Sequence, residues 1–316
     1  MIGGEHDVLA DLSLPGLYAE LTRDGLSRRL LELARDEDLG PDAIDATALA
    51  TLDPAERATA LLRAREGGIA SGLACLPDLL DVFRSDQIEC DISGVDGDRI
   101  EAGQTLATLT GPTRDIVRLE RTMLNLISRL SGIATRTGEF VAQIPEGSRA
   151  HLYDTRKTTP GWRALEKYAV RCGGGRTHRL GLYDAILIKD NHLASIPLAE
   201  LTDRLTESLT RARAGADLRF VQVEVDSIDQ LDRVLAIAPG LIDVVMLDNF
   251  EPERLEHGVA MRDDKAPDVD LEASGGVTLE SIARIATTGV ERISVGSLTH
   301  HAVSLDLGLD IEPASA

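Results

Sequence analysis

Residues 154–192 read DTRKTTPGWRALEKYAVRCGGGRTHRLGLYDAILIKDNH, and this stretch decides the fold. It begins at the polar end of one short apolar run (AHLYD, 150–154) and continues through a helical segment (PGWRALEKYAVRC, 160–172). A glycine-rich loop then leads to a second apolar run (AILIK, 185–189). Two short strand-like runs joined by a helix predict a β-α-β unit with parallel strands.

The same alternation continues to residue 296. Further strand-like runs lie at 220–225, 242–247, 269–273 and 292–296, and helical segments lie at 197–214, 227–238, 251–262 and 278–289. This pattern predicts an α/β fold with a parallel sheet or β/α barrel. Each strand-like run ends in polar residues or glycines. We therefore expect the active site at the carboxyl ends of the strands, where β/α barrels carry it.

The first third of the chain has a different pattern. Helical periodicity at 26–39 stops at Gly40-Pro41. Strand-like runs with glycine turns occupy 58–73 and 87–112, on either side of a short helix at 77–83. This mixture predicts an α+β unit with an antiparallel sheet.

A long helix is predicted at 113–144, with a break near Ser131-Gly132. We place the domain boundary in this region. Residues 1–130 would form the N-terminal domain and residues 131–296 the catalytic barrel. Residues 297–316 would be a C-terminal tail that packs back on the N-terminal domain.

Composition limits the class of protein. The 316 residues contain no apolar run near the roughly 20 residues of a membrane helix, and the N-terminus lacks the pattern of a secretory signal. A formal net charge of −20 argues against nucleic acid and anionic membranes as partners. Three cysteines without CxxC spacing favour reduced thiols. We therefore expect a cytoplasmic protein.

The stretch at 154–192 concentrates positive charge in an acidic chain. It contains eight Lys and Arg residues against four acids, and it holds three of the four lysines of the protein. Lys167, in the predicted helix, is assigned to a solvated face. Five groups leave the first two barrel strands or the loop between them: Arg156, Lys157, His178, Arg179 and Lys189. Because their mutual repulsion would cost stability without an anion between them, we predict a pocket for a small, multiply negative substrate.

Two carboxylates, Glu224 and Asp248, leave the third and fourth strands. They could simply pair with the nearby cations. The alternative is Mg²⁺, a hard cation that proteins usually hold through one or two carboxylates together with substrate phosphates. Beside an anion pocket, the two carboxylates fit a site for a Mg–diphosphate ligand.

The last two strands end in small residues: Ser274, Gly275 and Gly276 in one case, Val295, Gly296 and Ser297 in the other. Most glycine pairs are only turns. Glycine after a late barrel strand, however, lets backbone N–H groups approach a phosphate, and two consecutive strands favour that role here. No Ser-His-Asp or Cys-His set is evident, so we predict electrostatic rather than covalent catalysis.

These motifs resemble one known family. The segments DTRKTTPGWRALEKYAV, GGGRTHRLGLYDAILIKDNH, VEVD, VVMLDN, EASGGV and ISVGSLTH are similar to those of quinolinate phosphoribosyltransferase, also called carboxylating nicotinate-nucleotide pyrophosphorylase. Upstream segments such as DGDRIEAGQTLATLTGPTRDIVRLERTMLN resemble its N-terminal half. The resemblance implies an N-terminal α/β sandwich, an open barrel of about seven strands, and a homodimer or multiple of dimers.

The resemblance also implies an activity. Phosphoribose would pass from phosphoribosyl pyrophosphate to the ring nitrogen of quinolinate, with Mg²⁺ as cofactor. Pyrophosphate and CO₂ would leave, and nicotinate mononucleotide would enter NAD biosynthesis. The implied catalytic residues are Lys157, Lys189, Glu224 and Asp248, of which the two carboxylates position the metal and the ribose hydroxyls.

The resemblance further assigns substrate contacts. Arg156, His178 and Arg179 would hold the carboxylates of quinolinate, and Arg121 would reach in from the partner subunit. Lys157 and Lys189 would neutralise charge on phosphoribosyl pyrophosphate and the second carboxylate. The remaining implied contacts, mostly backbone amides for the 5′-phosphate, are Thr155, Ser274, Gly275, Gly276, Val295, Gly296 and Ser297.

Two other functions stay open. One is a paralogue of the same fold linked to molybdenum transport, against which the complete set of cations argues. The other is a non-catalytic anion-binding barrel, which could dispense with Glu224 and Asp248. Departures from the family pattern at Trp162, at Thr177 and at 127–128 remove no charged group from the predicted pocket.

Overall fold

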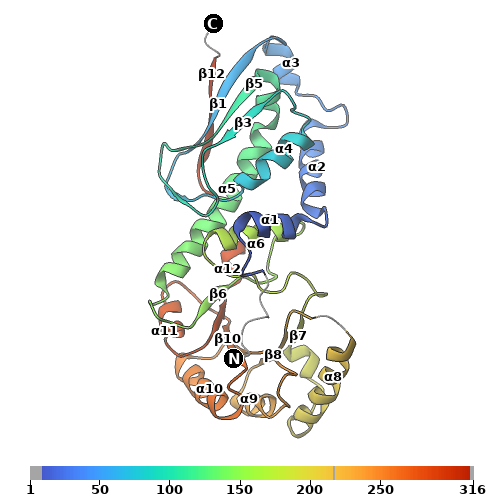
Figure 1. The fold of residues 1–316 in the computed structure, drawn as a ribbon, viewed down its shortest axis with the longest axis vertical. Helices are drawn as coiled ribbons and strands as arrows, with labels where there is room; N and C mark the ends of the chain where they lie inside the picture. Colours follow the sequence, from blue (N-terminus) through green and yellow to red (C-terminus); the bar gives the residue numbers. More distant parts are fainter. Residues whose placement is uncertain (1–8, 216–217, 314–316) are drawn as a thin grey trace. The chain divides into compact units, whose positions relative to one another are not determined.

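The computed structural model describes residues 9–215 and 218–313, which form two compact units (Figure 1). The α+β unit comprises Leu12–Gly138, Lys157–Gly174 and the C-terminal segment from Ser297. The barrel unit comprises Glu139–Arg156, Gly175–Gly296 and residues 9–11. The chain therefore crosses between the units after residues 11, 138, 156, 174 and 296, whereas the predicted domain boundaries lay after residues 130 and 296. Residues 1–8 of the predicted N-terminal domain and 314–316 of the predicted tail lie outside the described residues.

The elements of the α+β unit are α1 (Leu14–Thr22), α2 (Leu26–Leu39), α3 (Ala46–Thr51), β1 (Arg57–Ala64), β2 (Gly68–Ile69), η1 (Leu73–Cys75), α4 (Leu76–Val82), β3 (Glu89–Ile92), β4 (Arg99–Ile100), β5 (Thr105–Pro112), α5 (Thr113–Gln143, which continues into the residues of the barrel unit), α6 (Arg163–Cys172), α12 (Ser297–His300) and β12 (Leu307–Pro313). Those of the barrel unit are β6 (His151–Tyr153), β7 (Ile186–Ile188), α7 (Asp190–Leu193), η2 (Leu198–Glu200), α8 (Leu201–Gly215), β8 (Val221–Val225), α9 (Ile228–Leu235), β9 (Val244–Asp248), α10 (Pro252–Lys265), β10 (Asp270–Ser274), α11 (Ile282–Ala286) and β11 (Arg292–Ser294).

The α+β unit is built around an antiparallel sheet with the strand order β12-β1-β5-β3. Buried residues alternate with less buried ones along β1, because successive side chains of a strand point to opposite faces. Ala60 and Leu62 of β1 are fully buried. β12, from the C-terminal segment, pairs with β1 along its whole length. The predicted α+β character of this part of the chain is confirmed.

Two helix predictions had different outcomes. α2 ends at Leu39, and Gly40 follows with φ +68°, as the glycine stop predicts. The predicted break in α5 is wrong, because the helix runs without interruption through Ser131-Gly132. A Cβ atom on Gly132 would lie 1.9 Å from the carbonyl oxygen of Val303. The glycine therefore permits close approach of the C-terminal segment to the helix.

The described residues of the barrel unit form a six-stranded parallel sheet in the order β6-β11-β10-β9-β8-β7. Beside β6, an isolated parallel bridge joins Tyr153 and Arg176. The side chain of Asp154 accepts the N–H of His178 at 2.8 Å, which removes the donor that would extend this pairing. The open α/β barrel is confirmed, with this bridge beside β6 in place of a full seventh strand.

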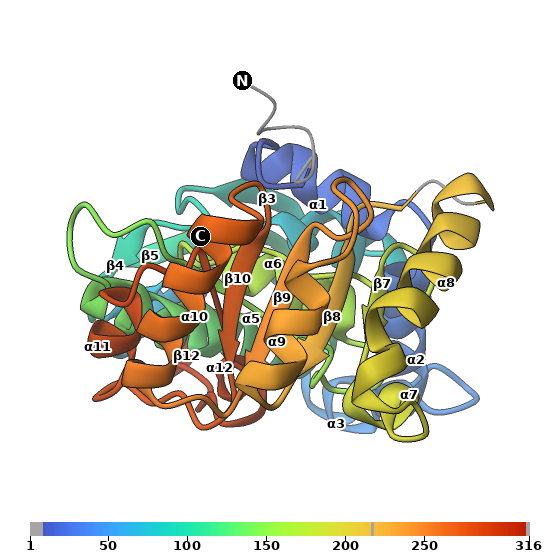
Figure 2. The same ribbon diagram turned by 90° about the horizontal axis from the view of Figure 1, so that it is seen from below.

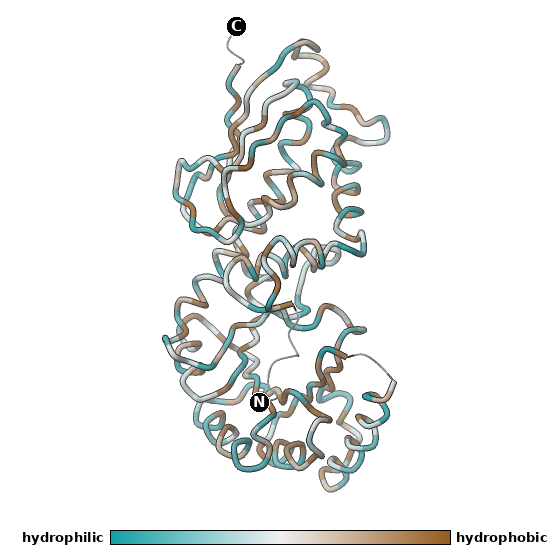
Figure 3. The backbone as a smooth tube through the Cα atoms, in the orientation of Figure 1, coloured by the Kyte–Doolittle hydropathy of each residue, from teal (hydrophilic) through white to brown (hydrophobic). Residues whose placement is uncertain are grey.

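Helices α8, α9 and α10 cover the outer side of β8, β9 and β10 (Figure 2). Leu231, Val234 and Leu235 of α9 are buried at the spacing of one helix face. Figure 3 shows hydrophilic and hydrophobic positions alternating along these outer helices. Within residues 9–215 and 218–313, we find no helix with the length and hydropathy needed to cross a membrane.

Candidate active site

The carboxyl ends of the central strands bring polar residues onto one face of the parallel sheet. Asp248 in β9 is in register with Ser274 in β10. Glu224 in β8 is in register with Met246, two residues before Asp248. Residues in register on parallel strands, and residues two apart on one strand, point to the same face. Glu224, Asp248 and Ser274 therefore share one face.

Lys189 and Glu224 form an ion pair at the ends of β7 and β8. Ile188 is in register with Val223, so the residues that follow them lie side by side. The Nζ atom of Lys189 is 3.1 Å from Oε2 of Glu224. Glu224 is 8% exposed, whereas Lys189 is exposed. In this contact Glu224 pairs with a nearby cation, which is the alternative to a metal role for its carboxylate.

The turn after β10 is shaped by two left-handed glycines, Gly275 with φ +93° and Gly276 with φ +60°. A Cβ atom on Gly275 would lie 2.2 Å from Oδ1 of Asn249. The N–H of Asn249 donates to the carbonyl of Ser274 at 2.8 Å, and its side-chain amide donates to Oδ2 of Asp248 at 2.7 Å. The turn is thus locked against the end of β9. Turns of left-handed residues are the type that present backbone N–H groups to anions.

Arg156, which follows β6, has a buried Nε atom without a hydrogen-bond partner anywhere in the described chain. The side chain as a whole is partly buried. A buried donor without a partner costs free energy, which a carboxylate or phosphate would recover by accepting it. Arg156 is therefore suited to binding an anion.

Two buried aspartates hold the loop that carries His178 and Arg179. Oδ1 of Asp154 accepts the N–H of His178, and the carboxylate of Asp184 accepts the N–H groups of residues 180–181 at 2.7 and 2.8 Å. The N–H of Arg179 donates to Nδ1 of His178 at 2.8 Å. Both side chains are buried, with 4% and 6% exposed. The backbone around these two residues is therefore fixed by side-chain acceptors.

The ring of His178 lies beside Glu272, for which the sequence pattern predicted no role. Nε2 of His178 is 3.4 Å from Oε2 of Glu272. Tyr153 and Phe220 meet the ring edge-on, with centroid distances of 6.4 and 5.1 Å. Both ring nitrogens of His178 thus face groups of the barrel.

Arg292 completes this buried cluster and was also missed. Its Nε donates to Oε2 of Glu272 at 2.9 Å, and its guanidinium lies 3.9 Å from the ring centroid of Tyr153. Burial alone would raise the pKa of Glu272, but the charges of His178 and Arg292 hold this pKa well below its usual range. The sequence carries a signal for both residues. Glu272 and Arg292 are charged residues within apolar strand-like runs, and they stand two positions before Ser274 and Ser294, respectively.

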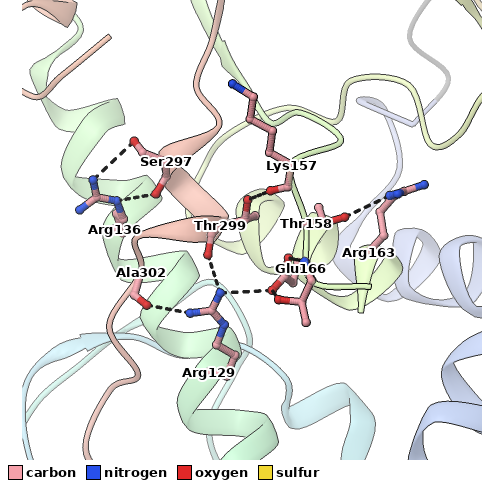
Figure 4. Close-up of polar contacts among 10 residues, drawn as sticks. Arg129, Arg136, Lys157, Thr158, Arg163, Glu166, Ser297, Thr299 and Ala302 are labelled. Atoms are coloured by element: carbon pink, nitrogen blue, oxygen red, sulfur yellow. Dashed lines mark hydrogen bonds and ion pairs between the residues drawn. The ribbon is translucent and has the colours of Figure 1, made fainter. Parts of the chain in front are cut away.

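Three predicted site residues belong to the α+β unit. Arg121 is exposed on α5. Lys157 is also exposed, and its carbonyl accepts a hydrogen bond from the hydroxyl of Thr299 (Figure 4). Ser297 begins α12, and its carbonyl accepts from Nε of Arg136 at 2.8 Å. Lys157 and Ser297 are thus tied to their own unit through backbone oxygens.

The prediction that Lys167 lies on a solvated helix face is wrong. Lys167 is fully buried, as is its neighbour Glu166. α6 contacts both α1 and α12, so the helix is enclosed on more sides than its sequence pattern indicates.

Glu224 and Asp248 fit a magnesium site of the kind that substrate completes. In residues 9–215 and 218–313, no group of three or more His, Cys, Asp or Glu side chains is arranged to hold a metal. Mg²⁺ does not require such a cage, because it usually takes one or two carboxylates together with phosphate oxygens and waters. Two carboxylates on one face of the sheet meet that requirement.

Comparison with protein families agrees with the arrangement of these elements. The N-terminal domain model of quinolinate phosphoribosyl transferase matches residues 45–131. The C-terminal domain model of the same family matches residues 133–310.

Individual proteins and solved structures are similar over most of the chain. A nicotinate-nucleotide pyrophosphorylase (carboxylating) of Mycobacterium leprae is 43% identical over 286 residues, covering 90% of this chain and 97% of that protein. Among solved structures, NadC from Streptococcus pyogenes has a TM-score of 0.82 at 31% identity, covering 96% of this chain and 99% of that one. The nicotinate-nucleotide pyrophosphorylase from Francisella tularensis has a TM-score of 0.78 at 35% identity, covering 97% and 99%.

Proposed function

The chain belongs to the quinolinate phosphoribosyltransferase family and is a phosphoribosyltransferase; we propose the following substrates, site and cofactor for it. The enzyme transfers phosphoribose from phosphoribosyl pyrophosphate to the ring nitrogen of quinolinate. CO₂ and pyrophosphate leave, and nicotinate mononucleotide is the product used for NAD biosynthesis. The observation in the structure that carries the proposal is the buried, unpartnered Nε of Arg156 on the barrel unit.

Quinolinate is a planar dicarboxylate, and guanidinium groups suit it. Arg156 and Arg179 would each offer N–H donors in a planar fork, which matches a carboxylate better than an ammonium does. His178 supports Arg179 directly, because its Nδ1 accepts the N–H of that residue. Arg121 would add a further guanidinium from the partner subunit.

Phosphoribosyl pyrophosphate would occupy the carboxyl ends of β8 to β11. The turn of Gly275 and Gly276 would receive the 5′-phosphate through backbone N–H groups. Lys157 and Lys189 would neutralise negative charge on the diphosphate, and Lys189 is already positioned by its ion pair with Glu224. Bound Mg²⁺, held by Glu224 and Asp248, would neutralise diphosphate charge further.

The reaction itself is a displacement followed by a decarboxylation. The bond from the anomeric carbon to pyrophosphate breaks, positive charge develops on the ribose ring, and the nitrogen lone pair of quinolinate forms the new bond. Glu224 and Asp248, near the ribose hydroxyls, would stabilise that developing charge. The bond to CO₂ then breaks, and its electron pair remains on the carbon beside the positively charged ring nitrogen until a proton is added.

A direct assay tests the proposal. Purified protein is mixed with phosphoribosyl pyrophosphate, Mg²⁺ and quinolinate labelled in the carboxylate that is lost. We expect nicotinate mononucleotide and labelled CO₂ in equal amounts, loss of both with EDTA, and recovery with excess Mg²⁺. Binding of phosphoribosyl pyrophosphate without either product would instead identify a non-catalytic anion-binding barrel.

The proposal also includes the location of the protein in the cell and its oligomeric state. We infer a cytoplasmic homodimer or a multiple of dimers, in which Arg121 enters the site of the partner subunit. The exposed position of Arg121 on α5 supports this assignment, since the side chain is available to another molecule. Light scattering of the purified protein at micromolar concentration would distinguish a monomer from a dimer.

A further inference from the structure

We propose that Thr299, Glu166 and Arg129 form a clamp that positions Lys157 for a diphosphate-bearing substrate. All four residues belong to the α+β unit. Figure 4 shows Thr299 beside the backbone of Lys157, with Glu166 and Arg129 on the side away from the lysine ammonium. The inference rests on the proposed function, because it takes phosphoribosyl pyrophosphate as the ligand of Lys157.

Three consecutive residues, 157–159, are each held by a different side chain. The hydroxyl of Thr299 donates to the carbonyl of residue 157. Nε of Arg163 donates to the hydroxyl of residue 158 at 3.1 Å. The carboxylate of Glu166 accepts both the N–H and the hydroxyl of residue 159, at 3.0 and 2.8 Å. Side chains from two separate segments of the chain therefore fix this stretch of backbone.

Arg129 connects the two principal holding groups. One of its terminal nitrogens donates to the carbonyl of Ala302 at 2.7 Å. The other donates to the carbonyl of Thr299 and lies 3.3 Å from Oε1 of Glu166. Glu166 is fully buried, and a buried carboxylate is stable only when it is paired and hydrogen-bonded. Arg129 thus balances the charge of Glu166 and holds the segment that carries Thr299.

The clamp acts on the backbone of Lys157 through its carbonyl oxygen. In Figure 4 the side chain of Lys157 extends away from Thr299, while its carbonyl points into the clamp. A lysine side chain is long and flexible, so the location of its charge depends on how firmly its Cα is held. Fixing the backbone in advance lowers the ordering cost of binding and improves placement during reaction. Thr299, Glu166 and Arg129 are accordingly positioning residues.

The first experiment separates the hydroxyl of Thr299 from its bulk. Thr299→Val removes the donor to the Lys157 carbonyl and keeps the shape, whereas Thr299→Ser keeps the donor. We expect Thr299→Val to raise the KM for phosphoribosyl pyrophosphate about tenfold, with less effect on the KM for quinolinate, and Thr299→Ser to restore it. Thr137→Val is the matched control, because Thr137 is also buried and its hydroxyl also donates to a backbone carbonyl.

The second experiment does not depend on catalysis. Hydrogen–deuterium exchange is measured for the peptide 157–162 in Arg129→Lys and in Arg118→Lys. Arg118 also lies on α5 and also donates to a carbonyl, that of Phe83, at 2.9 Å. We expect faster exchange in this peptide for Arg129→Lys, because the acceptor of the Thr159 N–H loses its partner, and unchanged exchange for the control.

The outcomes are distinct. If Thr299→Val has the KM of the wild type, or if Thr299→Ser is as defective as Thr299→Val, the hydroxyl does not position Lys157. Unchanged exchange at 157–162 in Arg129→Lys would also overturn the clamp. If the wild type makes no nicotinate mononucleotide, the proposed function fails, whereas the exchange experiment still decides whether the clamp exists.

Discussion

Several charged residues inside the barrel unit are paired with an opposite charge, and Arg156 differs from them. Glu272 lies between His178 and Arg292, and Glu224 pairs with Lys189. A buried charge is tolerated only with such a partner. The buried Nε of Arg156 has none among the described hydrogen-bonding groups. An anion bound there would gain more than at any of the paired residues.

Replacing Arg156 or Lys189 should therefore weaken the interaction of the protein with its substrates. We expect Arg156→Ala and Lys189→Ala each to lower kcat/KM by about a hundredfold or more, because each removes a charge that acts on the substrate. Thermal unfolding of Arg156→Ala should stay close to that of the wild type, whereas Lys189→Ala should unfold at a lower temperature because it leaves the buried Glu224 without its ion-pair partner. Steady-state kinetics with both substrates provides the measurement.

Lys265→Ala is the matched control for Lys189→Ala. Lys265, at the end of α10, is the remaining lysine of the chain outside residues 154–192, and it forms an exposed ion pair with Asp232 of α9. The Lys265→Ala protein should retain the turnover of the wild type. Near-normal rates for both Arg156→Ala and Lys189→Ala would show that the substrate pocket lies elsewhere.

Glu272 should make the stability of the protein sensitive to acid. Its pKa in the folded protein lies below its ordinary value because of His178 and Arg292, despite burial. The carboxylate therefore contributes its full stability above the ordinary glutamate pKa of about 4.3, and this contribution is lost as the pH falls below that value. Between about pH 4 and pH 3, the wild type should lose about 1.4 kcal/mol per pH unit relative to Glu272→Gln.

Denaturant unfolding of both proteins from pH 6 to pH 3 measures that difference in slope. Glu272→Gln is less stable at neutral pH because Arg292 loses its charged partner, so only the change with pH is diagnostic. Parallel stability curves for the two proteins would show that Glu272 has an ordinary pKa in the folded state.

Among the elements, the turn after β10 combines a conformational requirement with a steric one. Gly275 has a left-handed backbone, and a Cβ atom added there would collide with the side chain of Asn249. Asn249 in turn donates to Asp248 at the end of β9. A side chain at residue 275 would therefore displace Asn249, and with it the hydrogen bond to a predicted metal ligand.

Gly275→Ala and Gly240→Ala separate the two requirements. Gly240 has a similar φ of +80°, but a Cβ atom there would meet nothing within 4 Å. Both variants should lose roughly 1–2 kcal/mol of stability from the left-handed backbone. We expect only Gly275→Ala to raise the KM for phosphoribosyl pyrophosphate, about tenfold. Equal KM values for the two variants would exclude a phosphate-binding role for this turn.

At the scale of the whole molecule, the predicted site residues are distributed over both units. The chain passes from the barrel unit to the α+β unit between Arg156 and Lys157, and again between Gly296 and Ser297. α5 carries Arg121 as well as the clamp residue Arg129. Neither unit alone contains the complete set of predicted site residues.

The shared site that we infer can be tested with mixed subunits. Arg121→Ala and Lys189→Ala should each be inactive as pure proteins. After mixing and subunit exchange, a quarter of the sites in a random population would combine two intact contributions, so about a quarter of wild-type activity should return. Continued inactivity, despite exchange shown with tagged subunits, would mean that Arg121 acts within its own chain or not at all.

Local patterns in the sequence were sufficient for the order of the elements and for most of the polar strand ends. The apolar runs of β6 to β11 and the periodic helices between them depend on neighbouring residues only, so they predict the barrel. The glycine stop after α2 was predictable for the same reason. The positions of Lys189, Glu224 and Asp248 at strand ends followed from this alternation.

The tertiary structure alone decided which groups became partners. Gly132 meets Val303 from the far end of the chain, Lys167 is buried by helices distant in sequence, and Glu272 meets Arg292 only through strand register. Hydrophobic periodicity shows which face of an element is buried, but it does not specify what covers that face. Close approach, burial of a charge and pairing of charges depend on contacts between distant segments, and these exist only once the chain has folded.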